Sequence, residues 1–188
     1  MHKPSNYESN NYTPVALGGH YAKIMEVQET TSKSGKDMIV VRIDFDGTDA
    51  QPSYFANRYR ADERTDKKWP NQATHYILAE NRAFNRFVNA LKASNETLKD
   101  FDKGADLDFK KAKNARIGVV YGEDEEFYNG ESRIRTRIRF FCDYDKVAEQ
   151  SIPAFRPASN SNTEGRSITG DEDFLKIPDG ADDGLPFA

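Results

Sequence analysis

The sequence has little of what enzyme and metal sites require. Its single cysteine, Cys142, excludes an internal disulfide, which is typical of a reducing compartment, and it lies in an apolar run as core residues do. The three histidines, His2, His20 and His75, are far apart and give no metal-ligand spacing with that cysteine. A glycine-rich phosphate loop and a Gly-x-Ser-x-Gly motif are also missing. We therefore expect no cofactor, no metal and no catalytic residues.

Long apolar runs are missing as well. No run approaches the length that spans a membrane, and the N-terminal residues lead to no apolar stretch of the kind a signal peptide needs. We therefore expect a cytoplasmic protein without a membrane partner. Of the 188 residues, 37% are hydrophobic and 31% are charged, which predicts one domain together with polar segments that do not fold alone.

The net charge of −4 does not by itself suggest a nucleic-acid binder. From Arg156 onward the chain has seven acids and three bases, and removing these from the 31 acids and 27 bases leaves 24 of each. Residues 1–155 are therefore close to neutral, and the acidity lies in the C-terminal segment. A neutral body can still carry a basic face that acidic loops balance elsewhere.

Apolar alternation predicts a hairpin near the N-terminus. We expect a first strand at His20–Thr30, a polar turn at 31–36 with a glycine, and a second strand at Asp37–Asp46. One face of the second strand carries Ile39, Val41, Ile43 and Phe45. The segment Pro52–Tyr59 reads as a weaker third strand, followed by a charged loop over 60–71.

A helix and two more strands are predicted to complete the body. Helical spacing of Phe84, Phe87, Val88 and Leu91 places a helix at Ile77–Ala93. After a polar connection at 94–113, an apolar strand covers Ala115–Tyr121 and an acidic turn covers 123–130. The last strand covers Arg133–Asp143.

This order, three strands, one helix and two strands, predicts an all-β fold: a five-stranded barrel of the oligonucleotide-binding (OB) type, with the helix between strands three and four. The predicted organisation is a flexible segment at 1–17, the OB domain at 18–150, and a disordered linker and acidic tail at 151–188.

Four arginines alternate in the last predicted strand. Because side chains two residues apart share a face and lie about 6–7 Å apart, we expect one face to carry Arg133, Arg135, Arg137 and Arg139. The other face then carries Ile134, Thr136, Ile138 and Phe140. The row is interpreted as a track for a nucleic-acid backbone. The alternatives are a salt-bridge lattice with a neighbouring strand and a solvated edge strand whose charges deter aggregation.

Aromatic side chains beside basic ones are the second signal, because single-strand binders combine a basic groove with rings on which bases stack. Trp69 lies in a charged loop, which makes it a candidate for stacking, although core or barrel-mouth packing is the alternative for the tyrosines. The candidates in these segments are Tyr54, Phe55, Arg58, Tyr59, Lys67, Lys68 and Trp69. On the first hairpin Lys23, Lys33, Lys36 and Arg42 could widen the basic surface.

The C-terminal stretch joins an acidic run to a small apolar tip, 182–187. This tip, Asp-Asp-Gly-Leu-Pro-Phe, is similar to the Asp-Asp-Asp-Ile-Pro-Phe ending of bacterial single-stranded-DNA-binding proteins. The hairpin between Tyr21 and Val41 is similar to the opening hairpin of phage OB-fold binders. The chain thus resembles a single-stranded-DNA-binding protein of the phage or prophage type.

The resemblance implies a domain that binds single-stranded DNA during replication, recombination and repair, in the host cytoplasm if the protein is phage-encoded. It also implies that replication and recombination proteins bind the tip, through Asp182, Asp183, Leu185, Pro186 and Phe187. This chain departs from the pattern because Gly184 replaces an acid and Ala188 follows the phenylalanine. The sequence does not set the oligomeric state, and a homo-oligomer is compatible with it.

Two other functions remain open from the sequence. The first is an OB-like protein-interaction module of a replication complex that does not bind DNA. The second is a magnesium-dependent nuclease, for which the acids Asp44, Asp46, Glu123, Asp124 and Glu125 are the candidates.

Overall fold

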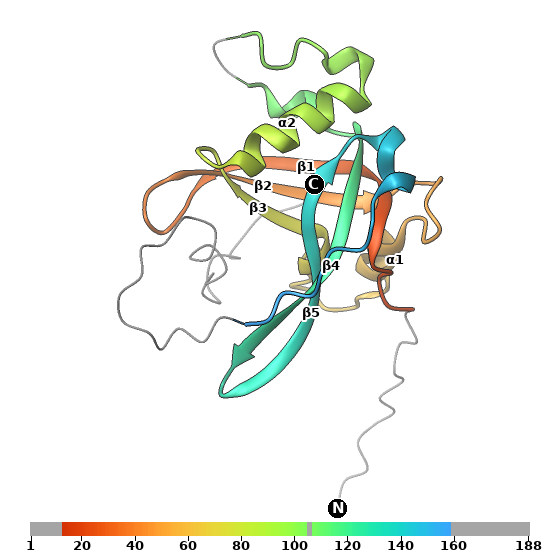
Figure 1. Ribbon diagram of the computed structural model, residues 1–188, viewed down its shortest axis with the longest axis vertical. Coiled ribbons are helices and arrows are strands. Elements are labelled where there is room, and N and C mark those ends of the chain that lie inside the picture. The colour runs from red at the N-terminus through yellow and green to blue at the C-terminus, as the bar shows by residue number, and fades with distance from the viewer. Residues whose placement is uncertain (1–12, 105–106, 159–188) are drawn as a thin grey trace, which may run out of the picture. The chain divides into compact units, whose positions relative to one another are not determined.

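The computed structural model describes residues 13–104 and 107–158, which form a mostly β structure (Figure 1). The strands are β1 (Gly18–Thr31), β2 (Asp37–Phe45), β3 (Thr74–Leu78), β4 (Arg116–Tyr128) and β5 (Glu131–Cys142). The α-helices are α1 (Tyr54–Ala61) and α2 (Arg82–Ser94). Short 3-10 turns occur at η1 (Asn71–Ala73), η2 (Glu96–Leu98), η3 (Phe109–Ala112) and η4 (Tyr144–Glu149).

The five strands form one antiparallel sheet in the order β3-β2-β1-β4-β5. β1 connects its two halves, because residues 18–23 pair with β4 and residues 22–31 pair with β2, and the β2 pairing has a register shift between Ile24 and Glu26. Placing β4 beside β1 after the β1-β2-β3 meander is the Greek-key order. The sheet is not closed, since β3 and β5 are its edges.

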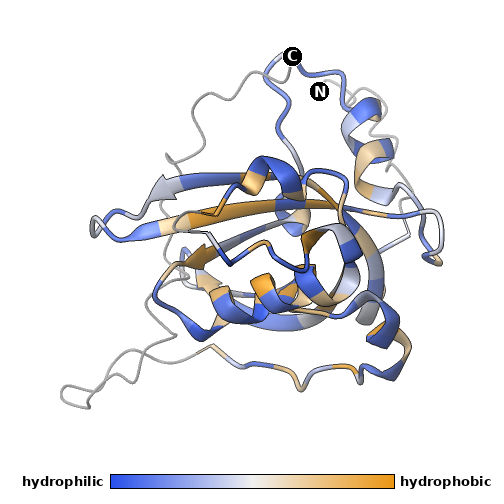
Figure 2. Cartoon of the chain, turned by 90° about the horizontal axis from the view of Figure 1, so that it is seen from above, coloured by the Kyte–Doolittle hydropathy of each residue, from blue (hydrophilic) through white to orange (hydrophobic). Residues whose placement is uncertain are grey.

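The inner face of the sheet forms the core together with α2. Ile39, Val41, Ile43 and Phe45 all lie in this core, which confirms the predicted face of the second strand. The helical stripe is also confirmed: Phe87, Val88 and Leu91 are buried, and Phe84 packs against the core. In Figure 2 the hydrophobic residues lie along the middle of the strands, whereas the hairpin ends and loops are hydrophilic.

The prediction of a third strand at Pro52–Tyr59 is wrong, because this segment forms α1. The carboxylate of Asp44 on β2 accepts hydrogen bonds from the N–H groups of Phe55 (3.0 Å) and Ala56 (3.3 Å), so a distant side chain satisfies the first turn of the helix. The third strand is instead β3, whose five residues all pair with β2. The helix begins at Arg82 and not at Ile77, because Asn81 caps it by accepting from the N–H of Ala83.

The predicted acidic turn at 123–130 is also wrong. β4 continues to Tyr128, and the chain reverses at Asn129 and Gly130, whose φ angles are 51° and 81°. Two consecutive residues with positive φ form the tight turn that Asn-Gly favours in hairpins. β4 and β5 therefore form a long hairpin that extends away from α2 in Figure 1.

Residues 151–158, the start of the predicted linker, hydrogen-bond to β4. The N–H of Arg156 donates to the carbonyl of Glu123 (3.1 Å), and the N–H of Glu125 donates to the carbonyl of Arg156 (2.8 Å). No helix in the described ranges is long and apolar enough to cross a membrane.

Candidate nucleic-acid interface

The β4–β5 hairpin places two arginines of the predicted row directly opposite acids. Arg133 pairs across the strands with Glu126, Arg135 with Asp124, and Arg137 with Gly122. Opposite charges facing each other across a strand pair stabilise that pair. Two features thus stabilise this long hairpin: opposite charges on its two strands, and the Asn129-Gly130 turn that joins them.

Three of these arginines remain accessible at the hairpin surface. Arg135 and Arg137 both bind the carboxylate of Glu126, with 2.7 Å between the Arg135 Nε and Glu126 Oε1. The Arg133 guanidinium lies over the ring of Tyr128, 5.1 Å from its centre, and 3.5 Å from the carboxylate of Glu131. These three side chains are 43%, 50% and 34% exposed in sequence order, so solvent and a ligand can reach them.

Arg139 differs from the other three because it is buried, with 7% of its side chain exposed. Its Nη2 lies 2.8 Å from an oxygen of Asp124 and donates to the carbonyls of Glu123 (2.9 Å) and Ala154 (3.0 Å). It lies over Gly122, where a Cβ would come within 2.6 Å of Nε. Burial lowers the pKa of Arg139, and the charge of Asp124 opposes that shift. Arg139 therefore links Ala154 to the hairpin by a hydrogen bond, and too little of its side chain is exposed to contact DNA.

The predicted alternation on β5 holds only up to Ile138. Ile138 pairs with Tyr121 but Phe140 pairs with Val120, so Arg139 is an extra residue in a bulge. The expectation that Phe140 lies with Ile138 is therefore wrong: Phe141 enters the core, and Phe140 lies under the Arg86 guanidinium, 4.1 Å away.

Tyr59 and Trp69 form an aromatic pair, here called the aromatic shelf, with ring centres 5.5 Å apart. The ammonium group of Lys67 lies 4.8 Å from the centre of the Tyr59 ring. The indole N–H of Trp69 donates to the carbonyl of Ile43 (3.1 Å), at a point on β2 beyond its pairing with β3. Trp69 is therefore held by the sheet while its side chain remains half-buried.

The aromatic shelf is connected to the arginine hairpin through η1. The Tyr121 hydroxyl on β4 donates to the carbonyl of Gln72 (2.7 Å), and Arg58 donates to the Gln72 side chain (2.9 Å). η1 also contacts β5, so the loop that carries Trp69 lies beside the strand that carries the arginines. The structure thus places the segment that follows Trp69 against β5, and the Tyr121 side chain reaches it from the face of the hairpin opposite Arg137.

The remaining predicted aromatic residues have other positions. Phe55 is fully buried between Phe45 and Tyr121, so no part of its ring is available for a base. Tyr54 is half-buried against Phe45 and Phe55, with Arg58 5.7 Å from its ring centre.

The basic residues of the first hairpin do not form one open tract. Arg42 is buried and paired with Glu26 (2.8 Å), and Lys36 is paired with Glu80. Lys23 is half-buried opposite Asp44, whereas Lys33 in the turn and Lys68 beside Trp69 are exposed.

Sequence reasoning missed three residues of these strands. Tyr76 lies on the outer face of β3 opposite Val40, in a segment predicted partly as helix, although its alternation Thr-His-Tyr-Ile-Leu was a strand signal. Glu126 and Tyr128 were assigned to a turn, although Asn129-Gly130 marked the true reversal.

The candidate nuclease acids have structural partners. Asp44 caps α1, Asp46 accepts from the Tyr144 hydroxyl, and Asp124 pairs with Arg139. Glu125 accepts from Ser132, and within the described ranges no group of three His, Cys, Asp or Glu residues could hold a metal ion.

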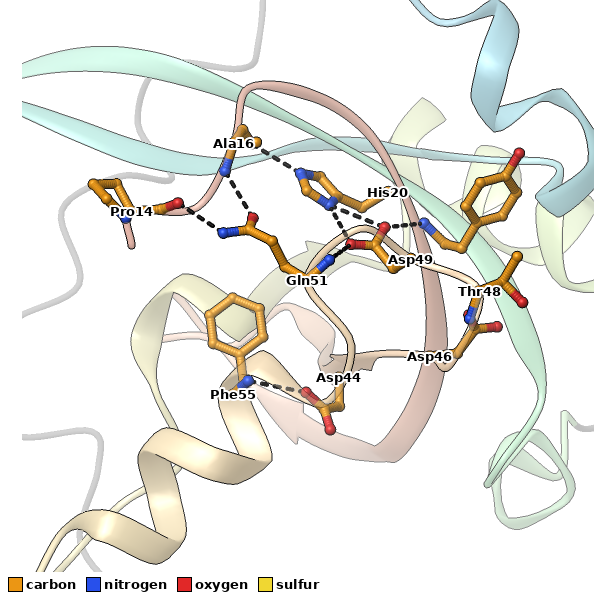
Figure 3. Close-up of polar contacts among 10 residues, drawn as sticks. Pro14, Ala16, His20, Asp44, Asp46, Thr48, Asp49, Gln51 and Phe55 are labelled. Carbon is orange, nitrogen blue, oxygen red and sulfur yellow. Dashed lines mark hydrogen bonds and ion pairs between the residues drawn. The ribbon is translucent and has the colours of Figure 1, made fainter. Parts of the chain in front are cut away.

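A buried pair, His20 and Asp49, ties the N-terminal segment to the loop after β2 (Figure 3). His20 Nδ1 lies 3.1 Å from both Asp49 oxygens, and Nε2 lies 2.9 Å from the carbonyl oxygen of Ala16. Burial by itself would raise the pKa of Asp49, but hydrogen bonds from His20 and from the N–H groups of Gln51 and Tyr21 lower it below its ordinary value of 3.8.

A carboxylate with a lowered pKa stabilises the fold above its unfolded pKa, and this stabilisation is lost as pH falls through the folded value. We therefore expect Asp49→Asn to cost about 2 kcal/mol at neutral pH, as charge-assisted hydrogen bonds do. The difference from wild type should begin to shrink as pH falls below the unfolded value of about 3.8, and it should vanish only below the lower folded pKa, where Asp49 is neutral in both states. Urea unfolding across this pH range measures the difference in unfolding free energy between wild type and Asp49→Asn, with Asp46→Asn as the control. The same destabilisation by Asp49→Asn at pH about 3 and at pH about 7 would contradict a stabilising charge on Asp49.

No protein-family model matches the chain, and no curated protein matches it.

The predicted partner-binding residues Asp182, Asp183, Leu185, Pro186 and Phe187 lie outside the described residues.

Proposed function

We propose that this protein binds single-stranded DNA with little sequence specificity, on the surface formed by the aromatic shelf and the β4–β5 hairpin. The observation that carries the proposal is that η1, which begins two residues after Trp69, contacts β5, the strand that presents Arg133, Arg135 and Arg137. Rings for stacking bases next to cations for the backbone are what sequence-tolerant single-strand binding requires.

The topology supports an OB-fold assignment for the domain. The sheet has five antiparallel strands in Greek-key order with α2 between β3 and β4, and OB-folds are partly open Greek-key barrels. The edges that remain apart, β3 and β5, approach each other through their side chains, since the rings of His75 and Phe141 are 5.6 Å apart. OB-folds bind oligonucleotides on the face of strands two and three and on the loops after strands one and four. In this chain those loops are 32–36 and 129–130.

The resemblance of the C-terminal tip adds a second role to the proposal. Residues 182–187 would recruit replication, recombination or repair proteins, while the folded domain holds the DNA. The protein itself would work in the cytoplasm, without catalysis.

Fluorescence anisotropy of a labelled oligothymidine tests the proposal. Binding should be saturable at low salt and should weaken by roughly 100-fold for a tenfold increase in salt, if three phosphates are neutralised at about −0.7 each in the log–log slope. No binding at low salt would favour the interaction module, and cleavage of the strand with magnesium would favour the nuclease.

A further inference from the structure

The carboxylate of Glu126 lies between two accessible arginines. One oxygen accepts from Arg135 Nε at 2.7 Å, and the other accepts from Arg137 Nη2. Two arginines thus share the carboxylate of Glu126. About a third of its side chain is exposed, so the arrangement is open to solvent and to a ligand.

Two guanidinium groups directed at the two oxygens of one acid can equally hold two oxygens of a phosphate. Building on the proposed function, we propose that Glu126 occupies the place of a backbone phosphate of the bound strand, and that DNA displaces it on binding. The fork formed by Arg135 and Arg137 is then a phosphate site that the free protein fills with its own carboxylate. Glu126 keeps the two arginines together and oriented, at the expense of affinity.

The other pairs of the hairpin are not suited to such an exchange. Asp124 and Arg139 are buried, so separating them would leave two unpaired charges without water. Glu131 is 75% exposed, and its carboxylate lies 3.5 Å from Arg133. An ion pair this exposed contributes little free energy, so DNA would lose little by breaking it. The exchange is therefore specific to Glu126.

Exchange at Glu126 has a consequence for the salt dependence. DNA releases condensed cations when arginines neutralise its phosphates, which gives a slope of about −0.7 for each phosphate of a single strand. A carboxylate that is displaced into solvent attracts cations again, and this uptake offsets part of the release. Removing the charge of Glu126 should therefore make binding both tighter and more salt-dependent.

The test is the variant Glu126→Gln in the full chain, titrated with labelled oligothymidine over a series of salt concentrations. We expect affinity at low salt to rise about threefold to tenfold, since two exposed ion pairs no longer compete. The slope of log K against log salt should steepen by up to about 0.7. The matched control is Glu125→Gln, which removes the same charge one residue away, on the other face of the hairpin, where Glu125 accepts from Ser132.

The outcomes separate this inference from the proposed function. If wild type does not bind oligothymidine, the proposed function fails. If wild type binds and the Glu126→Gln and Glu125→Gln variants show equal affinity and slope, DNA binding stands and the exchange at Glu126 is overturned. A gain confined to the variant at position 126 supports the exchange, because a general change in net charge would appear in both.

Discussion

Replacing Arg133, Arg135 and Arg137 together by alanine is expected to weaken binding of oligothymidine roughly 100-fold at about 50 mM salt. The three guanidinium groups are accessible on the hairpin, and each would neutralise one phosphate. The slope of log K against log salt should flatten by about 1.4 to 2.1, the lower value applying if displaced Glu126 takes up a cation. Anisotropy titrations at several salt concentrations measure both quantities.

A second triple variant controls for the loss of net charge. Lys99, Lys103 and Lys111 form exposed pairs with acids in the connection between α2 and β4, on the side of the domain opposite the hairpin tip (Figure 1). Replacing these lysines by alanine removes the same three charges, and we expect only a small loss of affinity. Equal losses in the two triple variants would show that net charge, and not the arginine row, governs binding.

Arg139→Ala is expected to destabilise the fold by about 3–5 kcal/mol, as removing one partner of a buried ion pair does. The substitution leaves the Asp124 carboxylate buried without its cation, and it frees the carbonyls of Glu123 and Ala154. Urea unfolding followed by circular dichroism measures this loss. The exposed Arg133→Ala provides the comparison, with a change of no more than about 0.5 kcal/mol.

A double variant separates pairing from packing at this site. Arg139→Met combined with Asp124→Leu removes both charges, and buried pairs replaced by apolar residues are often as stable as before. We expect this variant to recover most of the stability and to keep the salt slope of wild type. If Arg139→Ala were as stable as Arg133→Ala and flattened the salt slope by about 0.7, Arg139 would belong to the DNA surface after all.

The parts of the fold that the sequence predicted are those with a clear period. Ile39, Val41, Ile43 and Phe45 alternate on β2, and Phe87, Val88 and Leu91 follow the helical repeat. Their burial depends on one face of one element, so a local pattern is sufficient to predict it. Trp69 was singled out for stacking because a tryptophan is unusual among charged residues, and that role stays a prediction, since the structure shows its side chain packed against the core.

The errors lie where a contact distant in the sequence decides the local structure. Pro52–Tyr59 has two tyrosines and a phenylalanine, as strands do, but Asp44 on β2 supplies the acceptor that begins α1 there. Phe55 was assigned to the binding surface because its neighbours are basic, whereas its burial depends on Tyr121 from β4. The bulge at Arg139 could not be predicted either, since it depends on the register between two strands.

The arginine row shows that two interpretations of one pattern can both apply. The acids opposite the arginines form the salt-bridge lattice that was considered for this strand, with Glu126 and Asp124 as its central members. Three of the four arginines nevertheless keep accessible surface, which a fully buried lattice would not leave. The exposed fraction of each side chain, which no sequence pattern gives, assigns Arg139 to the fold and the other three to the proposed interface.

The most direct test of the proposed binding surface uses Trp69, the one tryptophan in the chain. Its emission can be followed while oligothymidine is added to the full-length protein at low salt. Stacking of a base on the aromatic shelf predicts a saturable fall in emission that added salt reverses. Unchanged Trp69 emission at all oligothymidine concentrations, in protein shown to be folded, would contradict single-strand binding at this surface.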